Sequence, residues 1–155
     1  MMLNNPSWEL EFFDAAKNWR KYQFENILKY INSSVLEVGP GTGNNVQYYR
    51  DRASEITLLE INKHMSNLLK SKFEGDQKIT VQNSDIYSQE RKFDTILYMD
   101  VLEHIEDDKK EINRALEQLK PGGNIIFFVT AFLVFFRKLL FSIGIPTVSK
   151  SEENQ

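Results

Sequence analysis

The sequence contains no cysteine and has no excess of positive charge. Without cysteine, the chain forms no disulfide bond and offers no thiolate ligand to a metal ion. Its 19 Lys and Arg residues stand against 22 Asp and Glu residues, which gives a net charge of −3. Nucleic-acid-binding domains normally carry a clustered basic surface, so we expect no nucleic-acid partner.

The opening residues do not have the pattern of a secretory leader, and the sequence contains no long uninterrupted apolar segment. Its first residues, MMLNNPSWELEFFD, have neither a cationic start nor an apolar run. The run IIFFVTAFLVFF over residues 125–136 is shorter than a membrane span and is followed by Arg137 and Lys138. We therefore expect a cytoplasmic protein in which this run is a buried strand leading into a further element. Peripheral contact with a membrane surface is the alternative.

The rest of the sequence alternates short apolar runs with stretches of helical period. Strands are expected at 35–38, 55–60, 78–82, 93–99 and 124–130. Helices are expected over 6–31, 44–52, 62–73 and from about 107 or 108 to 119, with a KPGG turn at 120–123. Leu68 and Leu116 are expected on the apolar faces of the last two helices. This alternation predicts an α/β fold: a Rossmann-like, doubly wound, mainly parallel sheet of about five strands with helices on both faces.

The segment VLEVGPGTGNN, Val35–Asn45, has the form of a nucleotide-type site. A strand that leads through a glycine loop into a helix places a ligand at the carboxyl ends of the strands. The dinucleotide fingerprint would have its third glycine at position 44, which is Asn44, so a nicotinamide enzyme is disfavoured. A Walker loop would continue with Lys and Ser or Thr, but Gly43 is followed by two asparagines. Neither phosphate-binding pattern fits.

Two acidic positions point to an adenosine ligand instead. Glu60 ends the second expected strand, where a carboxylate can accept hydrogen bonds from both hydroxyls of a ribose. Asp85 and Ile86 follow the third expected strand, where an acid can accept from an adenine amino group and an apolar residue can cover the ring. A ribose without a 2′-phosphate suits such a carboxylate.

Five segments resemble, in order and at similar spacing, the successive motifs of class I S-adenosylmethionine-dependent methyltransferases: VLEVGPGTGNN, LLEIN, NSDIY, FDTILYMDVLEHIEDD and LKPGGNIIFFV. The resemblance covers about residues 20–130. The N-terminal ELEFFDAAKNWRKYQFENIL is similar to the lead-in helix of small-molecule methyltransferases. The resemblance implies an enzyme that transfers a methyl group from S-adenosylmethionine to a small-molecule acceptor, leaving S-adenosylhomocysteine. The attacking atom is O, N or C.

The resemblance also implies roles for the residues of the glycine loop. Gly39, Gly41 and Gly43 would pass close to the methionine part of the cofactor. Glu37 would lie under the loop and either order its amides or contact the cofactor amine. The alternative for Glu37 is a strand-end acid that stabilises the following helix.

At the other positions the resemblance implies contacts with the adenosine and the methyl donor. Glu60 would hold the ribose, Ile61 would lie beside the adenine, and Asp85 with Ile86 would bind the adenine amino group and ring. Asp100 would border the methyl donor and the acceptor pocket. The alternatives are a solvated strand end for Glu60, an Asx turn for Asp85 and a helix N-cap for Asp100.

The segment DVLEHIEDD also contains candidate catalytic groups. Asp100 and His104 are the candidate bases, needed only for an acceptor that must lose a proton. Asp100, Glu103 and His104 together are also similar to a segment of metal-dependent ubiquinone-type O-methyltransferases. A structural or pocket-lining role is the alternative, and we assign no metal ligand.

We expect a single methyltransferase-like domain over 1–145, followed by a polar tail over 146–155. Residues 1–32 would form a helical lid, with Trp19, Arg20 and Tyr22 near the methionine carboxylate; simple packing on the sheet is the alternative. Residues 33–130 would form the cofactor-binding core, and residues 131–145 an apolar element.

The family's sheet normally has seven strands, and the residues after Thr130 are too few for the last two. The apolar element would then cover the edge of the fifth strand or contact a second copy, a partner subunit or a membrane. A non-catalytic or partner-dependent cofactor-binding module, truncated after the fifth strand, is the alternative function.

Overall fold

A computed structural model describes residues 6–129 of the chain, and their side chains from residue 17 onward. The predicted apolar element at 131–145 and polar tail at 146–155 lie outside the described residues. Five strands form one sheet in the order β3-β2-β1-β4-β5, with every neighbouring pair parallel. Their bounds are β1 Ser34–Val38, β2 Glu55–Leu59, β3 Ile79–Gln82, β4 Phe93–Met99 and β5 Leu119–Phe128. The predicted fold class is confirmed.

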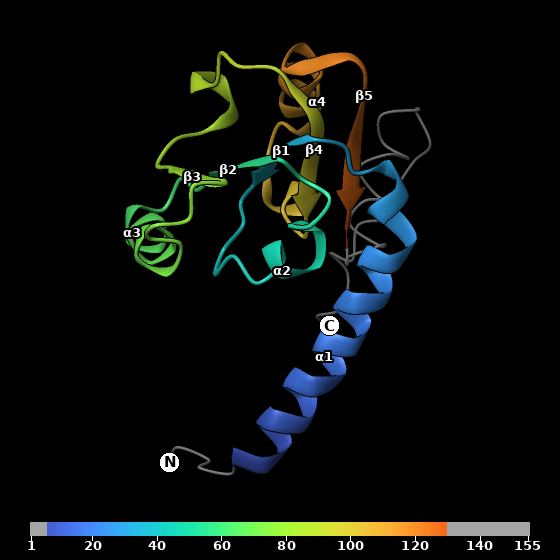
Figure 1. Ribbon diagram of the computed structural model, residues 1–155, viewed down its shortest axis with the longest axis vertical. Helices are drawn as coiled ribbons and strands as arrows, with labels where there is room; N and C mark the ends of the chain where they lie inside the picture. Colours follow the sequence, from blue (N-terminus) through green and yellow to red (C-terminus); the bar gives the residue numbers. More distant parts are fainter. Residues whose placement is uncertain (1–5, 130–155) are drawn as a thin grey trace, which may run out of the picture.

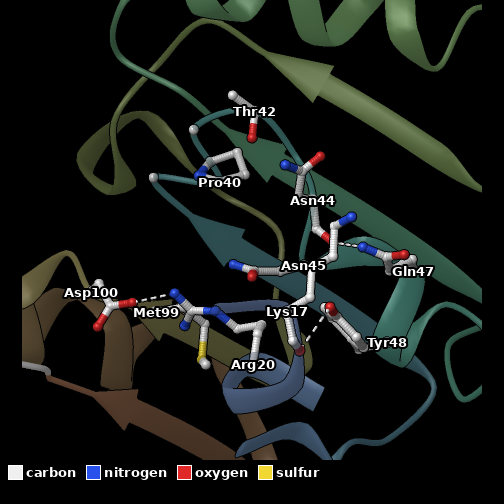
Figure 2. A pocket seen from close by; sticks show the side chains of 12 residues that line it. Lys17, Arg20, Pro40, Thr42, Asn44, Asn45, Gln47, Tyr48, Met99 and Asp100 are labelled. Atoms are coloured by element: carbon white, nitrogen blue, oxygen red, sulfur yellow. Dashed lines mark hydrogen bonds and ion pairs between the residues drawn. The ribbon is translucent and has the colours of Figure 1, made fainter. Parts of the chain in front are cut away.

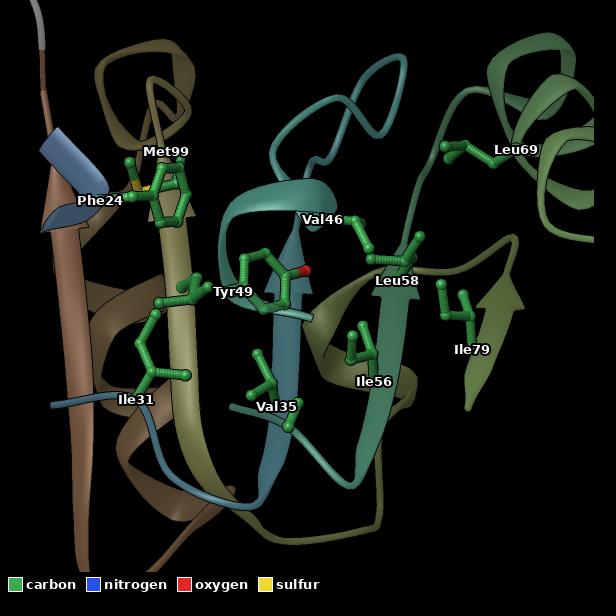
Figure 3. Packing of buried hydrophobic residues seen from close by; sticks show 12 residues of the cluster. Phe24, Ile31, Val35, Val46, Tyr49, Ile56, Leu58, Leu69, Ile79 and Met99 are labelled. Carbon is green, nitrogen blue, oxygen red and sulfur yellow. The ribbon is translucent and has the colours of Figure 1, made fainter. Parts of the chain in front are cut away.

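Helices cover both faces of this sheet (Figure 1). On one face lie α1 (Pro6–Ile27), α2 (Val46–Tyr49) and α3 (Lys63–Lys72). They pack on the sheet through the cluster in Figure 3, to which α1 contributes Phe24, α2 Tyr49 and α3 Leu69. On the other face lie α4 (Asp108–Glu117) and the short 3-10 helix η2 (Ile86–Ser88). All five residues of β1 are buried, which explains their nearly continuous apolar character.

The strand order places a ligand site at the carboxyl ends of β1 and β4. The chain runs outward from β1 through β2 to β3, and then crosses back to β4 on the other side of β1. This reversal is the topological switch point, where the loops after the two strands diverge and leave a crevice. The glycine loop follows β1 and Asp100 follows β4, so both lie at this crevice.

The expected KPGG turn is wrong, because these residues lie within β5. Phe93 of β4 pairs with Leu119, and Thr95 pairs with Asn124, so residues 120–123 form a bulge in a strand that continues through them. Gly122 adopts a φ of +77°, which favours glycine. The sequence shows residues typical of a turn. It does not show that β5 pairs with β4 both before and after them.

Two expected core leucines are exposed, Leu68 in α3 by 51% and Leu116 in α4 by 54%. Ser66 and Glu111 are buried in their helices instead. Glu111 accepts a hydrogen bond from the hydroxyl of Tyr98 at 2.9 Å, so a polar contact with β4 fixes this face of α4.

The helix expected at 44–52 is shorter in the structure, where it spans Val46–Tyr49. Among the described residues, no helix is long and apolar enough to cross a membrane.

Candidate functional site

The glycine loop turns tightly at the end of β1. The amide of Gly39 donates to the carbonyl of Leu59 at 2.9 Å, and the amide of Gly43 donates to the carbonyl of Pro40 at 2.9 Å. A Cβ atom added at Gly41 would meet no atom within 4 Å, and the φ of Gly41 is +56°. The backbone at Gly41 therefore faces open space, which suits the close approach of a ligand.

The other two glycines are explained by packing within the protein. A Cβ on Gly39 would lie 2.8 Å from a methyl of Val101, in the chain that follows β4. A Cβ on Gly43 would lie 2.7 Å from Leu69 and 2.8 Å from Phe73, at the end of α3. Gly39 and Gly41 line the pocket described below, whereas Gly43 is not among its lining residues. Gly43 thus contacts α3, and its approach to the ligand stays a prediction.

A lysine of α3, not recognised in the sequence, holds the outer side of the loop. Lys72 Nζ donates to the carbonyl of Thr42 and to Oδ1 of Asn44, each at 2.8 Å. The residue is far from the loop in sequence and lies in a polar, exposed turn, so no local pattern indicates it. Together with Leu69 and Phe73, Lys72 makes α3 a support for the glycine loop.

We expect Lys72→Met to lower the affinity for S-adenosylhomocysteine about threefold to tenfold, because two hydrogen bonds to the loop are lost. Lys70→Met, in the same helix, is the matched control and should leave the affinity unchanged. Calorimetric titration with S-adenosylhomocysteine measures the affinity of each variant. Equal affinities of Lys72→Met and the unmodified protein would show that α3 does not set the loop conformation.

Glu37 lies beneath the loop and is fully buried. Its Oε1 accepts from the side-chain amide of Asn45 and its Oε2 from the hydroxyl of Tyr49, each at 2.7 Å. Asn45 is the N-cap residue of α2 and Tyr49 lies in it, so Glu37 joins loop and helix to β1. Burial raises the pKa of Glu37, and burial together with Glu37 raises the pKa of Tyr49. The support of the following helix, which the sequence left open, is thus present, and a contact of Glu37 with the cofactor stays a prediction.

We expect Glu37→Gln to stabilise the protein at pH 8 by about 1 kcal/mol, because a buried charge is removed. The amide oxygen can still accept from Asn45, and the amide nitrogen can donate to the Tyr49 hydroxyl. A carboxyl whose pKa is raised by folding contributes most below its unfolded value of 4.5, and this contribution is lost as the pH rises through the folded pKa. The advantage of Glu37→Gln should therefore shrink as the pH falls toward 4.5. Urea denaturation of both proteins between pH 8 and pH 4.5 measures the difference in their free energies of unfolding. A difference that does not change with pH would contradict the argument.

A pocket of about 460 Å³ opens between the glycine loop, α1 and the end of β4 (Figure 2). Its lining comprises Lys17, Arg20, Gly39, Pro40, Gly41, Thr42, Asn44, Asn45, Gln47, Tyr48, Met99 and Asp100. Asp100 is the only carboxylate among these residues, and Lys17 and Arg20 are the only cationic side chains. The pocket therefore presents both signs of charge.

Arg20 and Asp100 form an ion pair across one end of this pocket (Figure 2). Arg20 Nη2 lies 2.5 Å from Asp100 Oδ2, while the other guanidinium nitrogen, Nη1, is buried without a hydrogen-bond partner. In the described part of the chain, Asp100 is the one non-glycine residue with a positive φ, +60°. Such strain is typical of functional positions. The N-cap alternative for Asp100 is wrong, since Val101 and Asp107 occupy the N-cap positions of the next two helices.

The acid predicted for the ribose lies at the end of β2. Glu60 is only 8% exposed, so the alternative of a solvated strand end is wrong. Its Oε1 accepts from the amide of Asn62 at 2.9 Å, which fixes the carboxylate. Ile61 beside it is 72% exposed, unusual for an isoleucine and suited to contact with a ring. Both residues lie outside the lining of the described pocket, and their ligand contacts stay predictions.

The two residues after β3 have separate environments. Asp85 Oδ1 accepts from the amide and hydroxyl of Ser88, so the Asx-type cap left open by the sequence is present. Ile86 is fully buried in the second core cluster, against Ala115 and other side chains of that face. The expectation that its side chain covers an adenine ring is therefore wrong, and only its main chain is left for that contact.

The candidate catalytic residues are not brought together. Asp100 lines the pocket, whereas His104, in the 3-10 helix η3 (Leu102–His104), is exposed and outside the lining. Within residues 6–129, no group of three or more His, Asp or Glu side chains is placed to hold a metal ion, so Asp100, Glu103 and His104 do not converge.

Comparison with known proteins identifies the family. A family model described as a methyltransferase domain matches residues 13–139. Demethylmenaquinone methyltransferase of Tropheryma whipplei is 26% identical over 119 residues, which are 76% of this chain and 49% of that protein. Ubiquinone biosynthesis O-methyltransferase of Coxiella burnetii is 29% identical over 127 residues, which are 79% of this chain and 54% of that protein.

A solved structure shows the same fold. The N-methyltransferase NodS from Bradyrhizobium japonicum, in complex with S-adenosylhomocysteine, matches with a TM-score of 0.62 at 20% identity, over 71% of this chain and 60% of that one. The chain spans about half the length of the curated relatives it matches. With the family match extending over most of the sequence, the chain belongs to the methyltransferase-domain family.

Proposed function

We propose that the chain binds S-adenosylmethionine and transfers its methyl group to a small-molecule acceptor. The observation that carries the proposal is the pocket at the switch point, which is lined by the open backbone of Gly41 and by the ion pair of Arg20 and Asp100. The relatives support it by their names, which describe methyl transfer in quinone biosynthesis and to nitrogen. Cytoplasmic location and association through residues 131–145 stay predictions.

The residues of the pocket fit the amino-acid end of this cofactor. The buried, unpartnered Nη1 of Arg20 is a donor that a carboxylate would satisfy. Asp100 beside it, and Glu37 beneath the loop, supply negative charge for an ammonium group. Glu60, one strand away, would accept from the ribose hydroxyls.

When bound, the cofactor supplies a methyl group on a positively charged sulfur, which is already electrophilic. The protein then has to hold the acceptor in line and exclude water, so proximity provides most of the rate. If the acceptor is a hydroxyl or a protonated amine, the carboxylate of Asp100 is the group in the pocket that can take its proton.

The test is methyl transfer by the purified chain, followed as S-adenosylhomocysteine formation with catechol, a primary amine and a sugar offered separately. We expect product with at least one acceptor, and a rate about a hundredfold lower in Asp100→Asn with the hydroxyl acceptor. A chain that binds the cofactor but forms no acceptor-dependent product would contradict the catalytic part of the proposal.

A further inference from the structure

Two aromatic side chains of α1 are exposed close to the pocket. Trp19 is 51% exposed and Tyr22 is 58% exposed. Their rings stack, with centroids 5.8 Å apart and planes at 24°. Stacking covers part of the Trp19 indole, and about half of the residue stays exposed. Paired, exposed aromatic rings are typical of surfaces that bind something.

Two contacts place Trp19 next to Asp100, at one end of the pocket. The ring of Trp19 meets the ring of Phe128 edge-on, at a centroid distance of 6.4 Å. The carbonyl of Phe128 accepts from the amide of Asp100 at 2.8 Å. Arg20, the next residue of α1, is itself paired with Asp100, and Met99 lies beside them (Figure 2). This turn of α1 is thereby fixed against the ends of β4 and β5.

Packing of the helix does not account for the exposed rings. Phe24 attaches α1 to the sheet, since it is 1% exposed and stacks on Tyr48 and Tyr49 at 5.2 and 5.8 Å. An apolar contact with Phe128 alone could be made by a smaller side chain than the indole of Trp19.

We propose that the exposed part of the Trp19 indole, with Phe128 and Met99, forms a wall of the acceptor site, and that the acceptor is a small molecule with a planar aromatic ring. This inference rests on the proposed function. An indole face binds a flat ring by offset stacking, whereas a sugar or an aliphatic chain gains much less from it.

The test uses the two tryptophans of the chain, Trp8 and Trp19, whose indole N–H signals are assigned by NMR with Trp19→Phe. The protein saturated with S-adenosylhomocysteine is titrated with catechol and, separately, with cyclohexane-1,2-diol, its saturated counterpart. We expect catechol to shift the Trp19 signal and leave the Trp8 signal in place, and the diol to shift neither. Trp19→Ala should raise the dissociation constant of catechol about tenfold.

Two controls make the result decisive. Tyr30→Ala removes another aromatic ring, 48% exposed, and should leave the affinity for catechol unchanged. Calorimetry with S-adenosylhomocysteine should give the same affinity for Trp19→Ala and for the unmodified protein.

If the cofactor product does not bind the unmodified protein, the proposed function fails and this inference with it. If it binds but catechol and the diol behave alike, or Trp19→Ala binds catechol normally, the inference alone fails. If the Trp19 signal shifts with protein concentration alone, the exposed surface around Trp19 contacts a second copy of the chain. That result would also overturn the inference.

Discussion

Alanine at Gly41 is expected to abolish most of the cofactor affinity, and alanine at Gly43 is expected to destabilise the fold. Both positions have a positive φ, +56° and +69°, so each variant carries about 1–2 kcal/mol of backbone strain. At Gly41 the new methyl group projects into open space in the pocket and stands where the ligand approaches. At Gly43 it lies 2.7 Å from the fully buried Leu69, which cannot move without disturbing the core.

The two variants should therefore separate binding from stability. We expect Gly43→Ala to lower the free energy of unfolding by about 2–4 kcal/mol and Gly41→Ala by about 1–2 kcal/mol. Gly41→Ala should weaken S-adenosylhomocysteine binding by more than about tenfold. Gly75→Ala is the matched control: its φ is +79° and its Cβ would meet nothing within 4 Å, but it lies at the end of α3, outside the pocket lining. Urea denaturation and calorimetry measure both quantities. If Gly41→Ala and Gly75→Ala bind equally well, the loop does not approach the ligand at Gly41.

Replacement of Arg20 is expected to have the second largest effect, and only on ligands that carry the amino-acid end. The buried Nη1 of Arg20 has no hydrogen-bond partner within the protein, whereas Nη2 is paired with Asp100. A charge-assisted hydrogen bond to a ligand carboxylate contributes about 1.5–3 kcal/mol. Arg20→Met should thus lower the affinity for S-adenosylhomocysteine about tenfold to a hundredfold.

The comparison ligand is 5′-methylthioadenosine, which has the adenosine and the sulfur but no amino acid. Its affinity should be nearly the same in Arg20→Met and in the unmodified protein. Lys21→Met is the control variant, because Lys21 is the neighbouring cation and its side chain is 68% exposed. The ion pair of Arg20 and Asp100 is partly exposed, with side chains 26% and 24% accessible, and such pairs contribute little to stability. The free energy of unfolding should therefore change by at most about 1 kcal/mol. An equal loss for both ligands would show that Arg20 does not meet the amino-acid end.

The sheet could be predicted because its strands are buried on both faces and read as apolar runs. The strand at 93–99 matches β4 to the residue, since all but Asp94 of its seven residues are buried there. The bulge at 120–123 could not be predicted, because the residues of a bulge are also those of a turn and only the pairing with β4 distinguishes them. Leu116 was placed wrongly because the hydrogen bond between Glu111 and Tyr98 decides which face of α4 is buried.

The site was predictable where it follows a strand and hidden where it depends on contacts distant in sequence. Glu37, Gly41 and Glu60 stand at strand ends, and topology alone brings strand ends to one edge. The pair of Arg20 with Asp100 and the contact of Lys72 with the loop join segments that share no local pattern. The burial of Ile86 likewise depends on α4 packing over it, which the residues next to it do not reveal.

The most direct test of the central claim is calorimetric titration of the full chain with S-adenosylhomocysteine, in the unmodified protein, in Glu60→Ala and in Glu55→Ala. Glu60 follows β2 at its carboxyl end, and Glu55 begins the same strand at the opposite end of the sheet. The account predicts micromolar binding by the unmodified protein and by Glu55→Ala, and an affinity at least about tenfold lower in Glu60→Ala, because the ribose hydroxyls lose a charged acceptor. A folded protein that does not bind, or a Glu60→Ala variant that binds as well as Glu55→Ala, would contradict it.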